Sequence, residues 1–218
     1  GNLGMAVVNA APDAAGALAM EAGEDSAILA VEPEGIMYAL SDLKGVSIDY
    51  LRGFRDCAQS LYTSVSSASP GGEGDTDLIE ASAFLNSPTH TWGLIATKAA
   101  TSRFTGQGIN VAVLDTGLFL SHPDFLGRSI VSRSFIPGVT SANDGHGHGT
   151  HCTGTACGAF KPAVGHRYGV AYKANIYIGK VLSVSGSGGV GGILAAIDWA
   201  VANRCQVISM SLGADVPS

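Results

Sequence analysis

The stretch Val111-Ala112-Val113-Leu114-Asp115-Thr116-Gly117 decides the fold of this chain. Its apolar, valine-rich part is short and is followed at once by turn-forming residues. This pattern predicts a β-strand over residues 110–115 that is buried on both faces. Because Asp115 ends an otherwise apolar strand, its carboxylate must be partly buried and must accept a hydrogen bond from a neighbouring donor.

Strands and helices alternate after this first strand. Residues 174–182 and 206–211 are two further apolar runs, which we expect to be strands, and residues 189–203 separate them. The apolar residues of that separating segment recur on one face of a helix: Val190, Ile193, Leu194, Ile197 and Val201. The pattern predicts an α/β fold, a parallel sheet with helices on both faces. Ligands of such sheets bind beyond the carboxyl ends of strands, where Asp115 and Ser211 lie.

A histidine-rich segment supplies the donor that Asp115 needs. Residues 144–151 read Asp-Gly-His-Gly-His-Gly-Thr-His. An acid that orients an imidazole, and an imidazole that accepts a hydroxyl proton, are two members of a serine protease triad. We therefore expect Asp115 to orient His148 and His148 to act as the general base. The alternative for Asp115 by itself is a cap on the turn that follows it.

Two other site types compete for these residues. His146, His148 and His151 have a spacing that would suit a metal. Small residues follow them, however, and suit a tightly packed helix better than an open coordination loop, so we expect no metal ligands. Glycines at positions 186, 188 and 191 also match a dinucleotide-binding fingerprint. No acid ends the next strand to bind a ribose, which argues against a dehydrogenase.

The chain resembles the subtilisin-like (subtilase) serine proteases over residues 92–215. Five segments in family order carry the resemblance: Val111–Gly117, Ser121–Asp124, His148–Thr155, Lys180–Leu182 leading to Gly186–Gly188, and Val207–Gly213. The resemblance implies that Asp115 orients the base, that His148 is the base and that His151 is structural. Residues 83–218 would then be the N-terminal portion of the catalytic domain.

The resemblance also implies how substrates bind. Gly186, Ser187 and Gly188, together with Ser211, Leu212 and Gly213, would pair with an extended peptide, so that peptide or protein substrates bind as added β-strands. The glycines allow the substrate backbone to approach closely. Three apolar residues would line subsites: Leu182, Ile193 and Leu212. At position 190, where many relatives carry an aromatic residue, this chain has valine, which implies a roomier pocket four residues upstream of the cut.

No candidate for the third triad member occurs in the chain. In the order Asp, His, Ser the nucleophile comes last, and Ser209 and Ser211 lie on the substrate-binding strand instead. We expect the serine and the oxyanion asparagine to lie beyond Ser218, which leaves the sheet incomplete. The predicted function is a serine endopeptidase zymogen portion, nicked or truncated, whose C-terminal remainder acts as a second chain. The alternative is an inactive peptide-binding or regulatory module.

The N-terminal part differs sharply in charge. Residues 1–82 hold 13 acids and 3 bases, a net charge of −10, whereas residues 83–218 hold 5 acids and 9 bases, a net charge of +4. An acidic segment of this kind could dock on a basic body. The alternative is two unrelated surfaces.

Apolar patterns predict a small α+β unit in residues 1–82. We expect a strand over residues 5–9, a helix over 14–22, a hairpin within 27–40 and an amphipathic helix over 48–65. Residues 66–77 are rich in Ser, Gly and Asp and predict a linker open to nicking. By resemblance this unit would be a propeptide that assists folding and inhibits its own enzyme, the alternative being an unrelated binding domain.

Several partners and cofactors are excluded or left open. The chain has no apolar run long enough for a membrane helix, and no basic patch with aromatics that would bind nucleic acid. We expect no required cofactor. Asp124 resembles a calcium ligand of some relatives, but residues 159–168 lack their Asn-rich loop. Four cysteines leave the redox compartment open. No signal peptide is visible, and the resemblance implies a secreted or extracytoplasmic protein.

Overall fold

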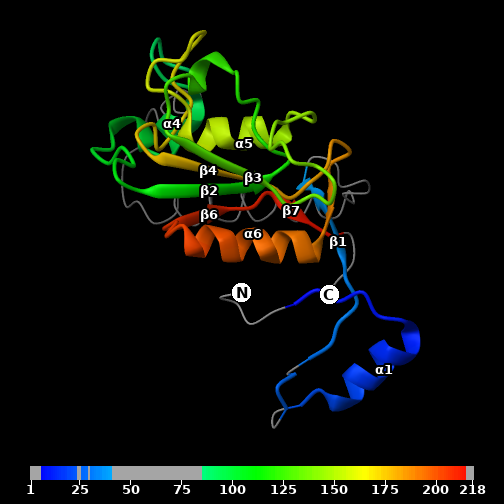
Figure 1. Ribbon diagram of the computed structural model, residues 1–218. Helices are drawn as coiled ribbons and strands as arrows, with labels where there is room; N and C mark the ends of the chain where they lie inside the picture. Colours follow the sequence, from blue (N-terminus) through cyan, green and yellow to red (C-terminus); the bar gives the residue numbers. More distant parts are fainter. Residues whose placement is uncertain (1–5, 24–25, 29, 41–84, 215–218) are drawn as a thin grey trace, which may run out of the picture.

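The computed structural model describes residues 6–23, 26–28, 30–40 and 85–214 (Figure 1). The predicted amphipathic helix over 48–65 and the linker over 66–77 lie outside the described residues. Among the residues described, no helix is long and apolar enough to cross a membrane.

A parallel four-stranded sheet forms the centre of the molecule. Its order is β3-β4-β2-β6, and all neighbouring pairs are parallel. The strands are β2 (Asn110–Asp115), β3 (Ile130–Ser134), β4 (Asn175–Lys180) and β6 (Val207–Ser209). Three of them confirm predicted strands. The sequence analysis did not identify β3, an edge strand with three exposed residues and no continuous apolar run.

Helices cover both faces of this sheet, as predicted (Figure 1). Helix α5 (His148–Cys157) packs on one face and α6 (Val190–Ala202) on the other. Each face has its own apolar cluster. Val113, Ile176 and Ile178 belong to the cluster that includes Cys157 of α5, whereas Leu114 belongs to the cluster that includes residues of α6. Alternate side chains along β2 therefore pack into the two apolar clusters on opposite faces of the sheet.

Short elements complete the part after residue 85. Helix α4 (Trp92–Ala96) and the 3₁₀ turns η2 (Ala99–Thr101) and η3 (Pro123–Phe125) lie before and between the strands. A second sheet has the order β5-β1-β7. Strands β5 (Ser187–Gly189) and β7 (Leu212–Gly213) flank β1 (Ile36–Ala39), which comes from the N-terminal part and runs antiparallel to both.

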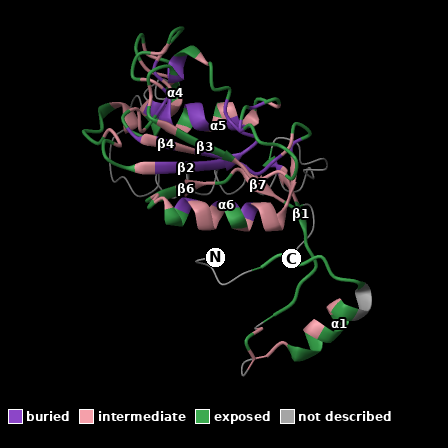
Figure 2. Cartoon of the chain, viewed as in Figure 1, coloured by how far each residue is buried: buried purple, intermediate pink, exposed green. Residues whose placement is uncertain are grey.

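The N-terminal part departs from the predicted α+β unit. Helix α1 (Pro12–Glu21) confirms the predicted helix, but it lies apart from the sheet and is largely exposed (Figures 1 and 2). The predicted strand over 5–9 was wrong, because residues 6–9 adopt no regular structure. The predicted hairpin within 27–40 was also wrong. Its second half forms β1, whose backbone pairs with β5 and β7 rather than with the residues that precede it.

Candidate active site

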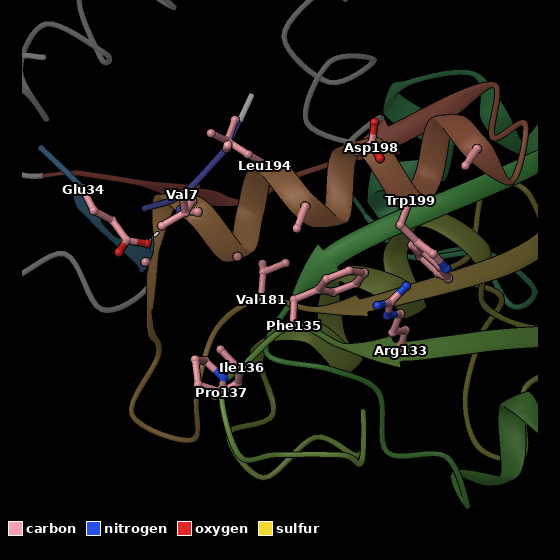
Figure 3. Close-up of a pocket in the computed structure, with 16 residues that line it drawn as sticks. Val7, Glu34, Arg133, Phe135, Ile136, Pro137, Val181, Leu194, Asp198 and Trp199 are labelled. Atoms are coloured by element: carbon pink, nitrogen blue, oxygen red, sulfur yellow. Dashed lines mark hydrogen bonds between the residues drawn. The ribbon is translucent and has the colours of Figure 1, made fainter. Parts of the chain in front are cut away.

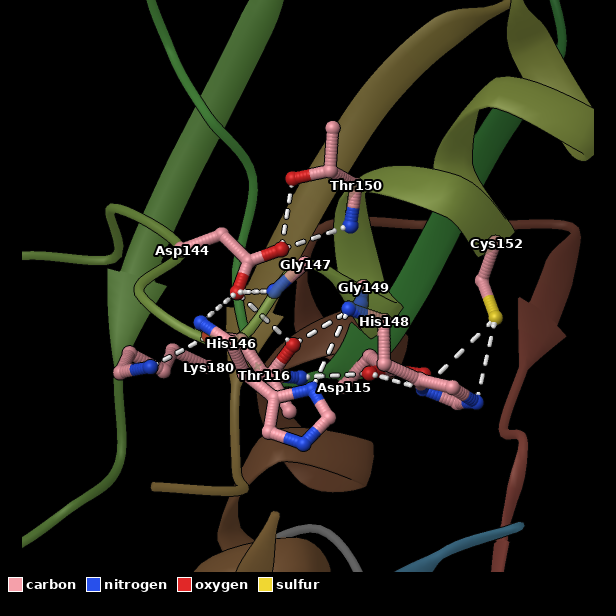
Figure 4. Close-up of polar contacts among 10 residues, drawn as sticks. All are labelled: Asp115, Thr116, Asp144, His146, Gly147, His148, Gly149, Thr150, Cys152 and Lys180. Carbon is pink, nitrogen blue, oxygen red and sulfur yellow. Dashed lines mark hydrogen bonds and ion pairs between the residues drawn. The ribbon is translucent and has the colours of Figure 1, made fainter. Parts of the chain in front are cut away.

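Asp115 and His148 meet at the carboxyl end of β2 (Figure 4). His148 Nδ1 lies 2.7 Å from Asp115 Oδ1. The carboxylate residue is 1% exposed, and the imidazole side chain is 11% exposed. The same Oδ1 accepts the Thr116 N–H at 2.6 Å. The two roles weighed for Asp115, histidine partner and turn cap, therefore occur together.

Glycine residues allow helix α5 to approach the end of β2. Gly149, in the first turn of α5, donates its N–H to Thr116 Oγ1 at 2.8 Å. A Cβ at Gly149 would lie 2.3 Å from the carbonyl oxygen of Gly117, far inside van der Waals contact. Gly147, the residue before the helix, has φ +105°, which favours glycine. The Gly-His-Gly sequence thus places the imidazole beside Asp115.

Asp144 holds the entry of α5 in place. Its Oδ1 accepts N–H groups of His146 and Gly147 and the hydroxyl of Thr116, each at 2.9 Å. Its Oδ2 accepts the N–H of Thr150 at 2.9 Å and the Thr150 hydroxyl at 2.6 Å. Burial raises the pKa of Asp144, but the donated hydrogen bonds outweigh burial and lower that pKa to about 2. A fixed carboxylate therefore lies at the N-terminus of the helix that carries His148.

Lys180 supports the same turn from the neighbouring strand. It ends β4, is 2% exposed, and its Nζ donates a hydrogen bond to the carbonyl oxygen of Thr116. Burial lowers the pKa of this ammonium, while the charges of Asp144 and Asp115 act in the opposite direction. The sequence analysis did not single out Asp144 or Lys180 as site residues. A signal was present for Lys180, which is a charged residue within an apolar run.

Cys152 lies against the other side of the imidazole. Its Sγ is 3.8 Å from both ring nitrogens of His148. Burial raises the pKa of the thiol, whereas a hydrogen bond with Ser211 opposes that shift. With Asp115 and His148 it forms the only group of three potential metal-binding residues in the described ranges. Asp115 Oδ1 already accepts the Thr116 N–H and meets His148 Nδ1, so within this group the carboxylate oxygen that faces the imidazole has protein partners.

The other histidines of the segment do not form the metal cluster considered above. His146 is edge-on to His148, with ring centroids 6.3 Å apart, and its Nδ1 accepts the His148 N–H at 3.3 Å. His151 is in no potential metal group of the described residues. The fit of Asp124 to calcium is also poor. Its Oδ1 accepts the Ala163 N–H at 2.6 Å and its Oδ2 accepts the Tyr168 hydroxyl, so both carboxylate oxygens already have protein donors.

The six residues predicted to bind substrate lie on either side of one strand. Met37 of β1 is paired with Gly188, and Tyr38 with both Ser187 and Gly213. Two further bonds extend the ladders. The Ala39 N–H donates to the Gly186 carbonyl at 2.8 Å, and the Leu40 N–H donates to the Ser211 carbonyl at 3.1 Å.

The slot between β5 and β7 has room for the backbone of one extended strand. A Cβ at Gly188 would lie 2.0 Å from the carbonyl oxygen of Val181, so this position requires glycine. Of the glycines that matched a dinucleotide fingerprint, Gly186 and Gly188 therefore lie at the edge that pairs with β1, whereas Gly191 is in the first turn of α6. Leu182 and Ile193, which were expected to line apolar subsites, are buried in one cluster with Ala39, and Leu212 packs against that cluster.

A pocket of about 780 Å³ lies where the N-terminal part meets α6 (Figure 3). Val7 and Glu34 line it from one side, and Phe135 and Trp199 from the sheet and helix side. Glu34 Oε1 accepts the Gly191 N–H at 2.9 Å in the first turn of α6. A carboxylate at a helix N-terminus is favourable, because it meets unpaired N–H groups and the positive end of the helix dipole. Glu34 thus joins β1 to the helix.

Comparisons with known proteins agree with these motifs. The model of the subtilase family matches residues 106–218, more than half of the chain. Subtilisin Savinase of Lederbergia lenta is 45% identical over 130 residues, which are 58% of this chain and 46% of that protein. A cuticle-degrading protease of Metarhizium anisopliae is 44% identical over 116 residues, 50% of this chain and 27% of that protein.

One solved structure with a similar chain is a cold-adapted subtilisin-like serine proteinase. It has 39% sequence identity and a TM-score of 0.41, over 47% of this chain and 35% of that chain. The chain thus spans less than half the length of each of these relatives.

Proposed function

The chain belongs to the subtilase family, and on that premise we propose that it is the N-terminal portion of a serine endopeptidase zymogen. The observation that carries the proposal is the 2.7 Å contact between His148 Nδ1 and Asp115 Oδ1, at the end of a slot already filled by a strand. The nucleophilic serine and the oxyanion asparagine would come from the remainder of the catalytic domain, in the same polypeptide or as a second chain.

The geometry of the pair assigns a role to each nitrogen of His148. Nδ1 donates its hydrogen to Asp115, so Nε2 carries the free lone pair. Nε2 would accept the proton of the serine hydroxyl as the oxygen attacks the peptide carbonyl, and would return that proton to the leaving amine. Water then hydrolyses the acyl-enzyme, with Nε2 again as the base. Asp115 holds the tautomer and stabilises the imidazolium.

Substrates would be peptides or proteins bound as a third strand between β5 and β7. Backbone hydrogen bonds tolerate many side chains, so specificity must come from the apolar surface beside the slot. Leu182, Ile193 and Leu212 supply this surface. Val190 presents a small side chain at the start of α6, which favours a bulky substrate residue four positions upstream of the cut.

Residues 1–82 would act as the inhibitory propeptide and residues 83–218 as the catalytic portion. The support is twofold: β1 occupies the substrate slot, and the two parts have opposite net charge. A secreted or extracytoplasmic location fits the protease relatives. The reaction requires no organic cofactor. Calcium has no carboxylate at Asp124 free of protein donors, so no step is assigned to it.

A fluorophosphonate probe tests the proposal on the full-length protein. We expect one serine to be labelled after the N-terminal part is removed, and peptide mapping to place that serine beyond residue 218. The His148→Ala variant should lose labelling, whereas Cys152→Ala should retain it. A protein that binds peptides in the slot but is never labelled would instead be the inactive binding module.

A further inference from the structure

Strand β1 is aligned in the slot with a defined register. Its ladder begins at Ile36, opposite Gly189, and its last two backbone bonds are those of Ala39 and Leu40. The strand therefore runs from the start of α6 toward Ser211. Leu40 is the last described residue before a gap in the described chain, and just before the ladder the Gly35 carbonyl accepts the Val190 N–H at 2.9 Å.

Ser211 brings the end of β1 to the Asp-His pair. Strand β6 pairs with β2 such that Ser209 lies opposite Val113. Ser211 is two residues beyond Ser209, as Asp115 is two residues beyond Val113, so both lie at the carboxyl edge of the sheet. Cys152, whose sulfur lies 3.8 Å from both His148 ring nitrogens, belongs to the same edge of the site.

From this register we infer that the enzyme cleaves its own chain at the peptide bond that follows Leu40. The inference rests on the proposed function and refines it, because the sequence placed the exposed linker at residues 66–77. The Leu40 N–H donates to the Ser211 carbonyl, so Leu40 is the last described residue of the strand that is bonded in the slot. The cut removes residues 1–40 and leaves residues 41–82 attached to the catalytic portion.

The reaction is a hydrolysis with water as the co-reactant. The carbonyl C–N bond after Leu40 breaks, the serine oxygen takes the acyl group, and His148 transfers the hydroxyl proton to the amine of residue 41. Water then attacks the ester, its hydroxyl completing the Leu40 carboxylate and its proton returning to the serine through His148. No oxidant or reductant takes part.

The buried side chain of the strand adds a specificity rule. Ala39 is fully buried among Val181, Leu182 and Ile193, so the position before the last residue accepts only a small side chain. Ile36, at the other end of the strand, is 57% exposed and has no such restriction. Other peptides or proteins that the enzyme cleaves should therefore carry a small residue immediately before the residue whose carbonyl carbon is attacked.

The test is the amino terminus of the full-length protein after self-processing, read by intact mass and terminal sequencing. We expect a new terminus at residue 41. Leu40→Pro removes the N–H that bonds to Ser211 and should slow the cut by at least about tenfold. Leu85→Pro is the matched control, since Leu85 is an exposed leucine between the predicted linker over residues 66–77 and residue 92, where the family resemblance begins. Ala39→Leu, which keeps every backbone bond, should slow the cut as well.

Each result has a defined meaning. A terminus at residue 41 that is lost in Leu40→Pro and kept in Leu85→Pro supports the inference. A terminus between residues 66 and 91, or an enzyme that hydrolyses synthetic peptides and never cuts after Leu40, overturns it while leaving the proposed function intact. A protein with neither fluorophosphonate labelling nor peptide hydrolysis overturns the proposed function and this inference with it.

Discussion

Two regions of the molecule are held by different kinds of contact. One is the corner formed by Asp115, Thr116, Asp144, Lys180 and the start of α5, and the other is the N-terminal part. At the corner, buried side chains of Asp144, Thr116 and Lys180 bond to one another and to the backbone. The N-terminal part is joined by two backbone ladders and by Glu34, while α1 is largely exposed (Figure 2). Met20 of α1 is 90% exposed. Backbone pairing demands little of the sequence. The first region is therefore built to be rigid, and the second is held mainly through its backbone.

The largest test of this contrast is Asp115→Asn in the full-length protein. The amide favours the wrong tautomer of His148 and cannot stabilise its cation, so kcat on a peptide substrate should fall about 10⁴-fold. Cys152→Ala is the control, because Cys152 touches the same ring without a charge; its kcat should stay within about tenfold of the unchanged protein. An equal loss in both variants would show that packing around the ring, not the Asp-His contact, is what the corner provides.

Gly149→Ala tests how tightly the corner is packed. The new methyl group would lie 2.3 Å from the Gly117 carbonyl and 2.9 Å from the Gly117 nitrogen. Backbone must shift to relieve this contact, so we expect the free energy of unfolding to fall by about 3 kcal/mol in urea titration. Gly93→Ala in α4 is the control. A Cβ there meets nothing within 4 Å, and a helical alanine should leave stability unchanged or slightly raised.

The sequence predicted most of the region that is held by buried contacts. Strands β2, β4 and β6 and helix α6 were foreseen because their apolar patterns reflect burial along the chain itself, and helix α5 because its small residues suit close packing. The contact between Asp115 and His148 was foreseen because a carboxylate at the end of an apolar strand needs a donor. Edge strand β3 was missed, since its exposed positions leave no apolar run.

The sequence predicted less of the N-terminal part, for a physical reason. Residues 36–39 have the pattern of a strand, but the pattern does not say which edge completes it. The nearest partner along the chain was residues 27–31, which is why a hairpin was predicted. In the structure, residues 36–39 pair instead with β5 and β7. Asp144 was missed because its role depends on five donors brought together by a turn, which no spacing in the sequence reveals.

Asp144→Asn distinguishes the two regions by pH. The folded pKa of about 2 lies below the ordinary value of 3.8, so ionised Asp144 stabilises the fold above pH 3.8, and that contribution disappears as the pH falls toward 2. In a His148→Ala background the variant should lose about 2 kcal/mol of unfolding free energy at pH 7. The difference from the unsubstituted protein should shrink near pH 2. Glu32→Gln, at an exposed position of the N-terminal part, should show no such pH-dependent loss.

The smallest expected effect is at the junction of the two regions. Glu34→Gln keeps the size of the side chain but removes the charge that meets the N-terminus of α6, a loss of about 0.3–1 kcal/mol. Local opening should therefore become about two- to fivefold more frequent, measured as faster hydrogen exchange at the Gly191 amide and along β1. The experiment uses full-length protein with His148→Ala, so that the chain stays intact. Glu32→Gln is the matched control, and amides of α5 should be unchanged in both variants. Faster exchange in α5 as well would mean that the N-terminal part is an integral element of the fold rather than a bound strand, because releasing a bound strand leaves the buried corner closed.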